Sequence, residues 1–168
     1  MPTAVQVHDV PEAIRSLSTF DRPDYVDLFV ASAEDASGTS TERWARAAME
    51  GAPAIGRFLA WRVCCGLRLD ETPSGDHVAG WRIAGRGNDW IRMEAASWFM
   101  TAHIVFRIER RRVSFATFIR YDRAIAAVIW GMASVAHRQV APGFLDGAVR
   151  RVARTRRATA GGRAASAR

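Results

Sequence analysis

The 168-residue sequence contains no lysine, so all 24 of its basic residues are arginine. Codon bias in a GC-rich genome is the simpler explanation, and use of arginine for phosphate or carboxylate recognition is the alternative. Acidic residues are absent from residues 147–168, whereas residues 1–146 hold 17 arginines and all 17 acids. The whole net charge of +7 therefore lies in this final segment, which indicates a neutral body with a basic tail.

Cysteine and long apolar runs are also scarce. Cys64 and Cys65 are adjacent, which disfavours a bridge between them, and two cysteines exclude a disulfide framework or a cysteine-rich zinc site. We expect both thiols to be buried as small apolar groups. The longest near-apolar run, residues 124–136, is too short to span a bilayer. The N-terminus lacks the pattern of a secretory signal, so we expect a cytoplasmic protein.

The sequence is otherwise rich in core-forming residues. Hydrophobic residues make up 49% of the chain and aromatic residues 10%, which argues against disorder over most of its length. We expect one domain over residues 1–155, with its core in about 20–150. Residues 156–168 are small and basic without large apolar side chains, so we expect a disordered tail there.

The spacing of apolar residues changes twice along the chain. Residues 24–33 alternate like a strand, and Thr39 with Glu42 forms a capping-box pattern for a helix that runs to Gly51. A second helix is expected from Pro53 to about Gly66. Residues 77–121 alternate again, which predicts four antiparallel strands: 77–85, two within 90–109 divided near 98–101, and 113–121.

From residue 123 the spacing is helical again. The strongest apolar stripe on a helical wheel, which we expect to face the sheet, contains Ile125, Val128, Ile129, Met132, Val135 and Ala136. Pro142 should kink or interrupt this helix before a shorter helical segment follows. The order of elements predicts an α+β fold in which a long C-terminal helix covers one face of a curved antiparallel sheet.

Trp130 and His137 stand out within this helix because seven residues make about two turns. They share one face, about 10 Å apart. The pair is either a packed part of the core wall or a site, since histidine is readily poised as an acid or base near neutral pH. His8, His77 and His103 are scattered along the rest of the chain, so we expect no metal site and no cofactor.

Thr117, Arg120, Trp130 and His137 follow a pattern in which a strand ending in Thr-x-x-Arg leads to a helix with Trp and, seven residues later, His. This arrangement resembles the helix-grip fold of the START-like (SRPBCC) superfamily. Within it, the chain resembles a domain family often found behind NAD(P)-binding epimerase-like domains, for which no reaction is assigned. The resemblance covers about residues 20–150. Gly80–Trp81 and Ser97 fall at matching positions, whereas Ala136 replaces the proline that commonly precedes the histidine.

The resemblance implies a cavity between the sheet and the C-terminal helix that binds a hydrophobic or aromatic small molecule. The residues expected at this cavity are Trp81, Thr117, Trp130 and His137 in its wall and Ser97 and His103 as polar contacts. Whether the chain is an enzyme is left open, because a superfamily fold does not define a reaction.

Two alternatives to simple binding follow from other residues. A cyclase- or dehydratase-like enzyme on the same scaffold would use His137 or Glu94 as its acid–base group. Glu94 lies in phase with Arg92, either facing the cavity, where its carboxylate must be paired or protonated, or in a solvated outer stripe, which we favour. A peripheral adaptor would instead contact anionic membranes or nucleic acid weakly through Arg150–Arg168, and an edge strand at 24–33 would allow a homodimer.

Overall fold

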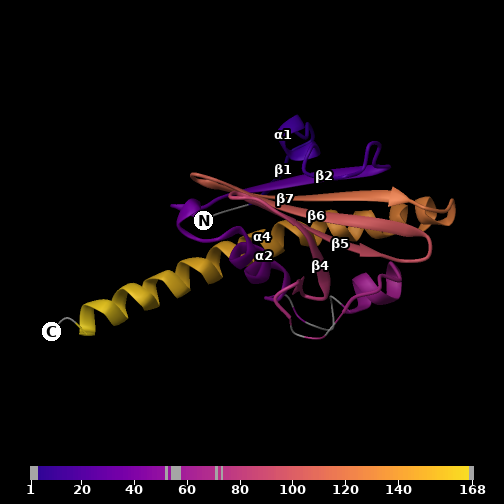
Figure 1. The fold of residues 1–168 in the computed structure, drawn as a ribbon. Coiled ribbons are helices and arrows are strands. Elements are labelled where there is room, and N and C mark those ends of the chain that lie inside the picture. Colours follow the sequence, from indigo (N-terminus) through magenta and orange to yellow (C-terminus); the bar gives the residue numbers. More distant parts are fainter. Residues whose placement is uncertain (1–3, 52, 54–57, 71, 73, 167–168) are drawn as a thin grey trace.

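One antiparallel sheet forms the centre of the molecule, with α1 on one side and α2 and α4 on the other (Figure 1). The computed structural model describes residues 4–51, 53, 58–70, 72 and 74–166. The strands are β1 (Val5–Gln6), β2 (Tyr25–Ser32), β3 (His77–Val78), β4 (Trp81–Arg86), β5 (Trp90–Ala96), β6 (Met100–Glu109) and β7 (Arg112–Tyr121). The helical elements are α1 (Glu12–Arg15), η1 (Ala36–Gly38), α2 (Thr41–Met49), η2 (Phe58–Cys64) and α4 (Ile125–Ser166).

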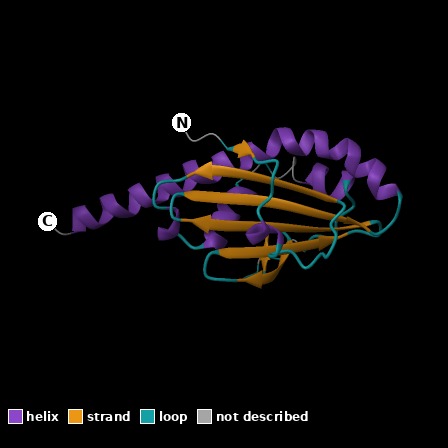
Figure 2. Cartoon of the chain, turned by 90° about the horizontal axis from the view of Figure 1, so that it is seen from above, coloured by secondary structure: helices purple, strands orange, loops and turns teal. Residues whose placement is uncertain are grey.

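The seven strands are hydrogen-bonded in the order β1-β2-β7-β6-β5-β4-β3, and every pair is antiparallel. Together with the long helix, this confirms the α+β class and the open antiparallel sheet (Figure 2). The prediction that residues 24–33 form an edge strand is wrong, because β1 pairs with β2 at Phe29 and Val30.

Residues 77–85, predicted as one strand, form two strands instead. A tight turn at Ala79 and Gly80 separates β3 from β4, and both residues have positive φ, 51° and 87°. Positive φ at both central positions is typical of the two-residue hairpin turn whose twist matches the flanking strands. The expected division near 98–101 is confirmed as the turn between β5 and β6.

Two local predictions beside the sheet are wrong. The cap of α2 is Ser40 rather than Thr39, since the Ser40 hydroxyl accepts a hydrogen bond from the Arg43 amide at 3.4 Å. Cys64 is exposed, and only Cys65 is buried. Burial raises the pKa of the Cys65 thiol to about 11, so this group is a neutral apolar filler. Residues 54–57 of the predicted second helix lie outside the described residues.

Apolar side chains fill both faces of the sheet. The larger cluster lies on the inner face, towards α2 and α4, and includes the fully buried Trp44, Phe106 and Leu145. A smaller cluster lies on the outer face beneath α1; its buried members are Val10, Ile14, Leu28, Val105, Ala116 and Phe118. The N-terminal segment, which reads as a polar lead in the sequence, therefore covers part of the outer face.

The helix α4 is rotated away from its predicted orientation. Most of the stripe expected to face the sheet is exposed, with Val128 59% and Met132 68% accessible. The buried face instead contains Ala126, Trp130, Ser134, Ala141, Leu145, Ala148 and Val152, with His137 half-buried between them. These residues recur every three or four positions through both halves of α4, whereas the predicted stripe ends before Pro142.

α4 is also longer than expected. It runs for 42 residues without interruption at Pro142, and it includes residues 156–166, which the prediction assigns to a disordered tail. Alanine and arginine, which dominate this segment, are both strong helix formers, and Arg156 is anchored to Asp35. No helix in the described part of the chain, α4 included, is long and apolar enough to cross a membrane.

The rotation of α4 predicts opposite costs for two apolar truncations. Leu145→Ala should lower the free energy of unfolding by about 2–5 kcal/mol, because it opens a cavity at a fully buried position. Met132→Ala should change it by less than about 0.5 kcal/mol, because this side chain is largely in solvent. Urea unfolding of the two variants measures both values; a larger loss for Met132→Ala would contradict the orientation described here.

Candidate functional site

A buried acid and a histidine meet between the sheet and α4. Asp27 lies in β2 and is 2% exposed, and its Oδ2 is 3.0 Å from Nε2 of His137 in α4. Asp27 occupies the phase of β2 that faces the helix, as does Phe29, because strand side chains alternate between the two faces. Pairing is required here, since an isolated carboxylate in an apolar interior is strongly destabilising.

Two hydroxyl groups complete the polar part of this cluster. The Tyr25 hydroxyl donates to Asp27 Oδ2 at 2.7 Å, and Thr117 Oγ1 is 3.2 Å from His137 Nε2. Thr117 stands directly opposite Asp27 in the register of β2 and β7, so both reach the same imidazole nitrogen. Burial and the neighbouring Asp27 carboxylate raise the pKa of Tyr25, which keeps its hydroxyl protonated as a donor.

Aromatic rings surround the histidine. The ring centroid of Trp130 is 5.4 Å from that of His137 and 5.2 Å from that of Tyr25. Phe29 and Phe115 lie on the sheet side, each just over 6 Å from the imidazole. All polar contacts of His137 with the described residues involve Nε2, so Nδ1 has no protein partner among them, and the side chain keeps 16% of its surface exposed.

Two polar atoms of this cluster are buried without a hydrogen-bond partner among the described residues: Asp27 Oδ1 and Trp130 Nε1. One is an acceptor and the other a donor. An unpaired buried polar group costs about 1–3 kcal/mol, and such groups in folded proteins usually have a functional or solvent-related reason. The cluster of Tyr25, Asp27, Thr117, Trp130 and His137 is hereafter called the inner cluster.

Of the residues predicted to line a pocket, the structure brings together Thr117, Trp130 and His137. Trp81 belongs to the same apolar core, but it lies in β4, and two strands separate β4 from β7. Its ring packs against Trp61, with the centroids 5.6 Å apart. Ser97 has a local structural role, since its hydroxyl accepts hydrogen bonds from the amides of Phe99 and Met100 in the β5–β6 turn.

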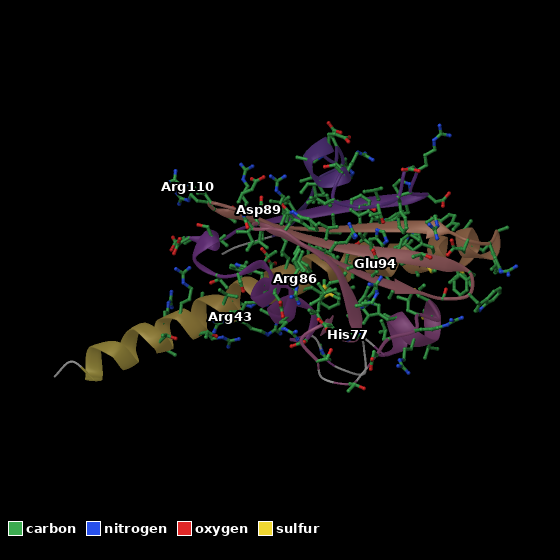
Figure 3. The ribbon with its side chains drawn as sticks, in the orientation of Figure 1. Arg43, His77, Arg86, Asp89, Glu94 and Arg110 are labelled. Carbon is green, nitrogen blue, oxygen red and sulfur yellow. The ribbon has the colours of Figure 1, made fainter. Side chains whose placement is uncertain are left out.

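His103 and Glu94 lie on the outer face of the sheet, opposite the inner cluster. His103 Nε2 is 3.4 Å from a Glu94 oxygen, and its Nδ1 is 2.9 Å from the Ser18 hydroxyl. Phe20 stacks on the imidazole with a centroid distance of 3.7 Å. Glu94, labelled in Figure 3, also pairs with Arg82 and Arg92. The outward orientation of Glu94 agrees with the preferred interpretation, but its carboxylate is held by these partners rather than merely solvated.

Ser18, His103 and Glu94 form a hydrogen-bonded row on this face, but His103 is not suited to act as a general base. Burial, followed by the positive charges of Arg92, Arg120 and Arg82, lowers the pKa of His103 to about 3. A general base is most effective when its pKa lies near the working pH. His103 is therefore a neutral hydrogen-bonding residue that fastens the N-terminal segment to the sheet.

Sequence reasoning missed Asp27 and Tyr25. A signal for Asp27 was present, because it is the only charge within "YVDLFVAS" and shares its phase with Tyr25, Phe29 and Ala31. A charged residue in the apolar phase of a strand needs a buried partner. The identity of that partner depends on the rotation of α4, which the sequence pattern did not predict correctly.

Comparisons with models of protein families, with curated proteins and with solved structures find no match for this chain. Among the described residues, no group of three or more His, Cys, Asp or Glu side chains is arranged to hold a metal ion. The chemistry of the inner cluster must therefore be judged from its own acid, imidazole, hydroxyl and indole groups.

The lowered pKa of His103 predicts a stability loss in acid. Between its ordinary value of 6.5 and about 3, the unfolded chain binds a proton that the folded chain does not, so stability falls as the pH falls. This contribution has a slope of at most about 1.4 kcal/mol per pH unit. His103→Gln retains a polar side chain but removes the titration.

Urea unfolding of wild type and His103→Gln from about pH 7 to about pH 4 measures this contribution. The stability advantage of the wild type should shrink, or reverse, as the pH is lowered. A difference between the two proteins that stays constant over this range would show that His103 titrates alike in the folded and unfolded chains.

Proposed function

We propose that this chain binds a small, largely apolar molecule between the sheet and α4, with the polar end of that molecule at the inner cluster. The observation that carries the proposal is the pair of buried, unpartnered atoms, Asp27 Oδ1 and Trp130 Nε1, within an aromatic surround. A ligand that offers both a donor and an acceptor would satisfy the two atoms. Small-molecule sites commonly combine an apolar lining with a few convergent polar groups.

The chemistry of the cluster narrows the class of ligand. Asp27 is an acceptor in its ionised form and already receives hydrogen bonds on Oδ2, so its free oxygen favours a ligand hydroxyl, amine or amide N–H. The rings of Phe29, Phe115 and Trp130 favour a flat or aromatic body beside that group. A second carboxylate is disfavoured, because it would place like charges together in a buried site.

We further propose that the fold is a helix-grip of the START-like type. Two observations support this proposal. The elements follow the order strand, helices, consecutive strands and long C-terminal helix, and α4 packs on the inner face of the sheet. The resemblance around Thr117, Trp130 and His137 agrees with it, since these three residues meet at the inner cluster. Ligands of such a fold would lie between the sheet and this helix.

An enzyme on the same scaffold is the second candidate, and the Asp27–His137 pair favours it. A carboxylate hydrogen-bonded to one imidazole nitrogen holds the ring and its tautomer, which leaves the other nitrogen able to accept a proton. Here Asp27 contacts Nε2, so Nδ1 of His137 would be the base. Glu94 is not the base in this proposal, because it lies on the outer face with three charged or donor partners.

Binding is tested by native mass spectrometry of gently purified protein and by uptake of Nile red, a neutral apolar dye. The wild type should retain a small-molecule mass or take up the dye. Trp130→Phe keeps an aromatic ring but removes the N–H, and should weaken retention of the molecule by about 2- to 13-fold, the equivalent of one hydrogen bond. Glu94→Gln, a change on the opposite face, is the control and should leave retention unaltered.

An empty wild-type protein that also excludes the dye would contradict the binding proposal. Equal losses in Trp130→Phe and in the Glu94→Gln control would contradict the assignment to the inner cluster. If a molecule is retained and identified, its conversion by wild type but not by His137→Gln, with binding preserved, would establish the enzymatic alternative.

A further inference from the structure

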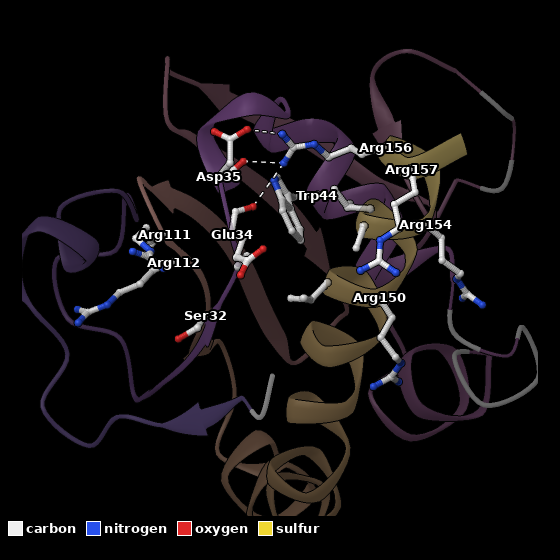
Figure 4. Close-up of a pocket in the computed structure, with 14 residues that line it drawn as sticks. Ser32, Glu34, Asp35, Trp44, Arg111, Arg112, Arg150, Arg154, Arg156 and Arg157 are labelled. Carbon is white, nitrogen blue, oxygen red and sulfur yellow. Dashed lines mark hydrogen bonds and ion pairs between the residues drawn. The ribbon is translucent and has the colours of Figure 1, made fainter. Parts of the chain in front are cut away.

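A hollow lies away from the inner cluster, where the end of the sheet meets the C-terminal half of α4 (Figure 4). It is a groove of about 1060 Å³. Its walls are formed by residues 32–35 at the end of β2, by the β6–β7 hairpin and by residues 149–157 of α4. Its apolar lining residues include Ala33, Val149 and Val152. This groove is independent of the proposed binding of an apolar molecule.

Arginines line the groove from two separate parts of the chain. Arg111 and Arg112 come from the hairpin, and Arg150, Arg154 and Arg157 come from α4. The three helical residues follow the i, i+4, i+7 spacing and so share one face over about 10 Å. All five are exposed, and their guanidinium groups have no hydrogen bond or ion pair with the described residues.

Two neighbouring arginines of α4, Arg151 and Arg156, are not free, because their guanidinium groups bind other parts of the fold. Arg151 donates to the carbonyl oxygens of Ala47 and Gly51 at the end of α2. Arg156 pairs with the Asp35 carboxylate and also donates to the Asp35 carbonyl at 2.9 Å. These two residues hold α4 against α2 and η1, whereas the other five arginines that line the groove with Arg156 make no such contact with the described residues.

The charge of the groove is strongly unbalanced. Asp35 is neutralised by Arg156, so Glu34 is the one lining carboxylate without a partner among the described residues. Five free guanidinium groups therefore face one carboxylate. Arginine presents several fixed donors that match phosphate oxygens in a bidentate manner, and walls of one sign concentrate oppositely charged ligands.

We infer that this groove binds a linear chain of phosphate groups, held between the hairpin arginines and the α4 arginines. The row on α4 is long enough to contact more than one phosphate, and the opposite wall provides further contacts. Trp44 is the aromatic residue among the described lining residues. It is 1% exposed and its indole N–H donates to the Ala36 carbonyl, so none of these residues offers a ring for base stacking. Binding is therefore expected to be independent of base sequence.

The test uses fluorescence anisotropy of the full-length protein with a labelled, short single-stranded oligothymidylate. Arg154→Gln/Arg157→Gln and Arg111→Gln/Arg112→Gln should each weaken binding by about 10-fold at physiological salt. Each should also make the negative slope of log K against log salt shallower by about 1.4. Arg22→Gln/Arg68→Gln is the matched control. It removes the same charge from exposed positions at the opposite end of the sheet and should change affinity by less than about 2-fold.

Glu34→Gln provides a change in the opposite direction. Removing this carboxylate should strengthen binding by about 2- to 4-fold, because it eliminates repulsion within the groove. Such a gain is not produced by partial unfolding, so it separates an effect on the site from loss of structure. Thermal unfolding of each variant confirms that it is folded.

The phosphate chain could belong to a free oligophosphate or to a nucleic-acid strand, and competition with tripolyphosphate distinguishes these two sources. Displacement of the oligonucleotide shows that a free oligophosphate is sufficient, and variant-sensitive binding without displacement assigns the groove to a nucleic-acid strand. Absence of oligonucleotide binding would overturn the inference. Equal weakening in the Arg22→Gln/Arg68→Gln control, or weakening by the α4 substitutions alone, would also overturn it, since the groove requires both walls.

Discussion

The pairing of Asp27 with His137 is the constraint on which the arrangement of α4 depends. Asp27 is almost completely buried in the sheet, and leaving its charge unpaired would cost more than exposing several apolar side chains in part. His137 can reach Asp27 only when its own face of α4 is turned to the sheet. That rotation buries Trp130 and Leu145 and places Met132 in solvent. One polar contact thus explains both the inner cluster and the exposed apolar strip that faces away from it.

The same rotation determines what the second half of α4 presents. Because the helix is continuous, turning His137 inward also directs Ala148 and Val152 towards the core and aligns Arg150, Arg154 and Arg157 along the groove. Arg151 and Arg156 then reach the carbonyl and carboxylate oxygens beside α2 and η1. Among residues 147–159, the arginines are therefore divided between two that fasten the helix and three that are free to contact an anion.

Much of the sheet follows from local sequence patterns, whereas the placement of α4 does not. Period-two patterns rich in β-branched and aromatic residues identify β2, β5, β6 and β7, although β6 and β7 are buried on both faces. The stripe expected on α4 is wrong because it treats Pro142 as an end. A window that stops there contains an apolar stripe of Val128, Met132 and Val135, and the longer stripe through Leu145 and Val152 is seen only when both halves are read together. Thr117, Trp130 and His137 could be predicted as neighbours from their spacing and the resemblance. The pairing of Asp27 with His137 could not be predicted, since the two residues are far apart in the sequence and their contact depends on tertiary packing.

Pro142 also has a mechanical consequence. Proline lacks an amide hydrogen, so the carbonyl of Arg138 receives no helical hydrogen bond from residue 142, although α4 continues past this point. The missing bond falls between the half that holds His137 and the half that holds the arginines of the groove. This turn is therefore the point along the continuous helix where a bend breaks no backbone hydrogen bond at the Arg138 carbonyl, and so the place where bending costs least.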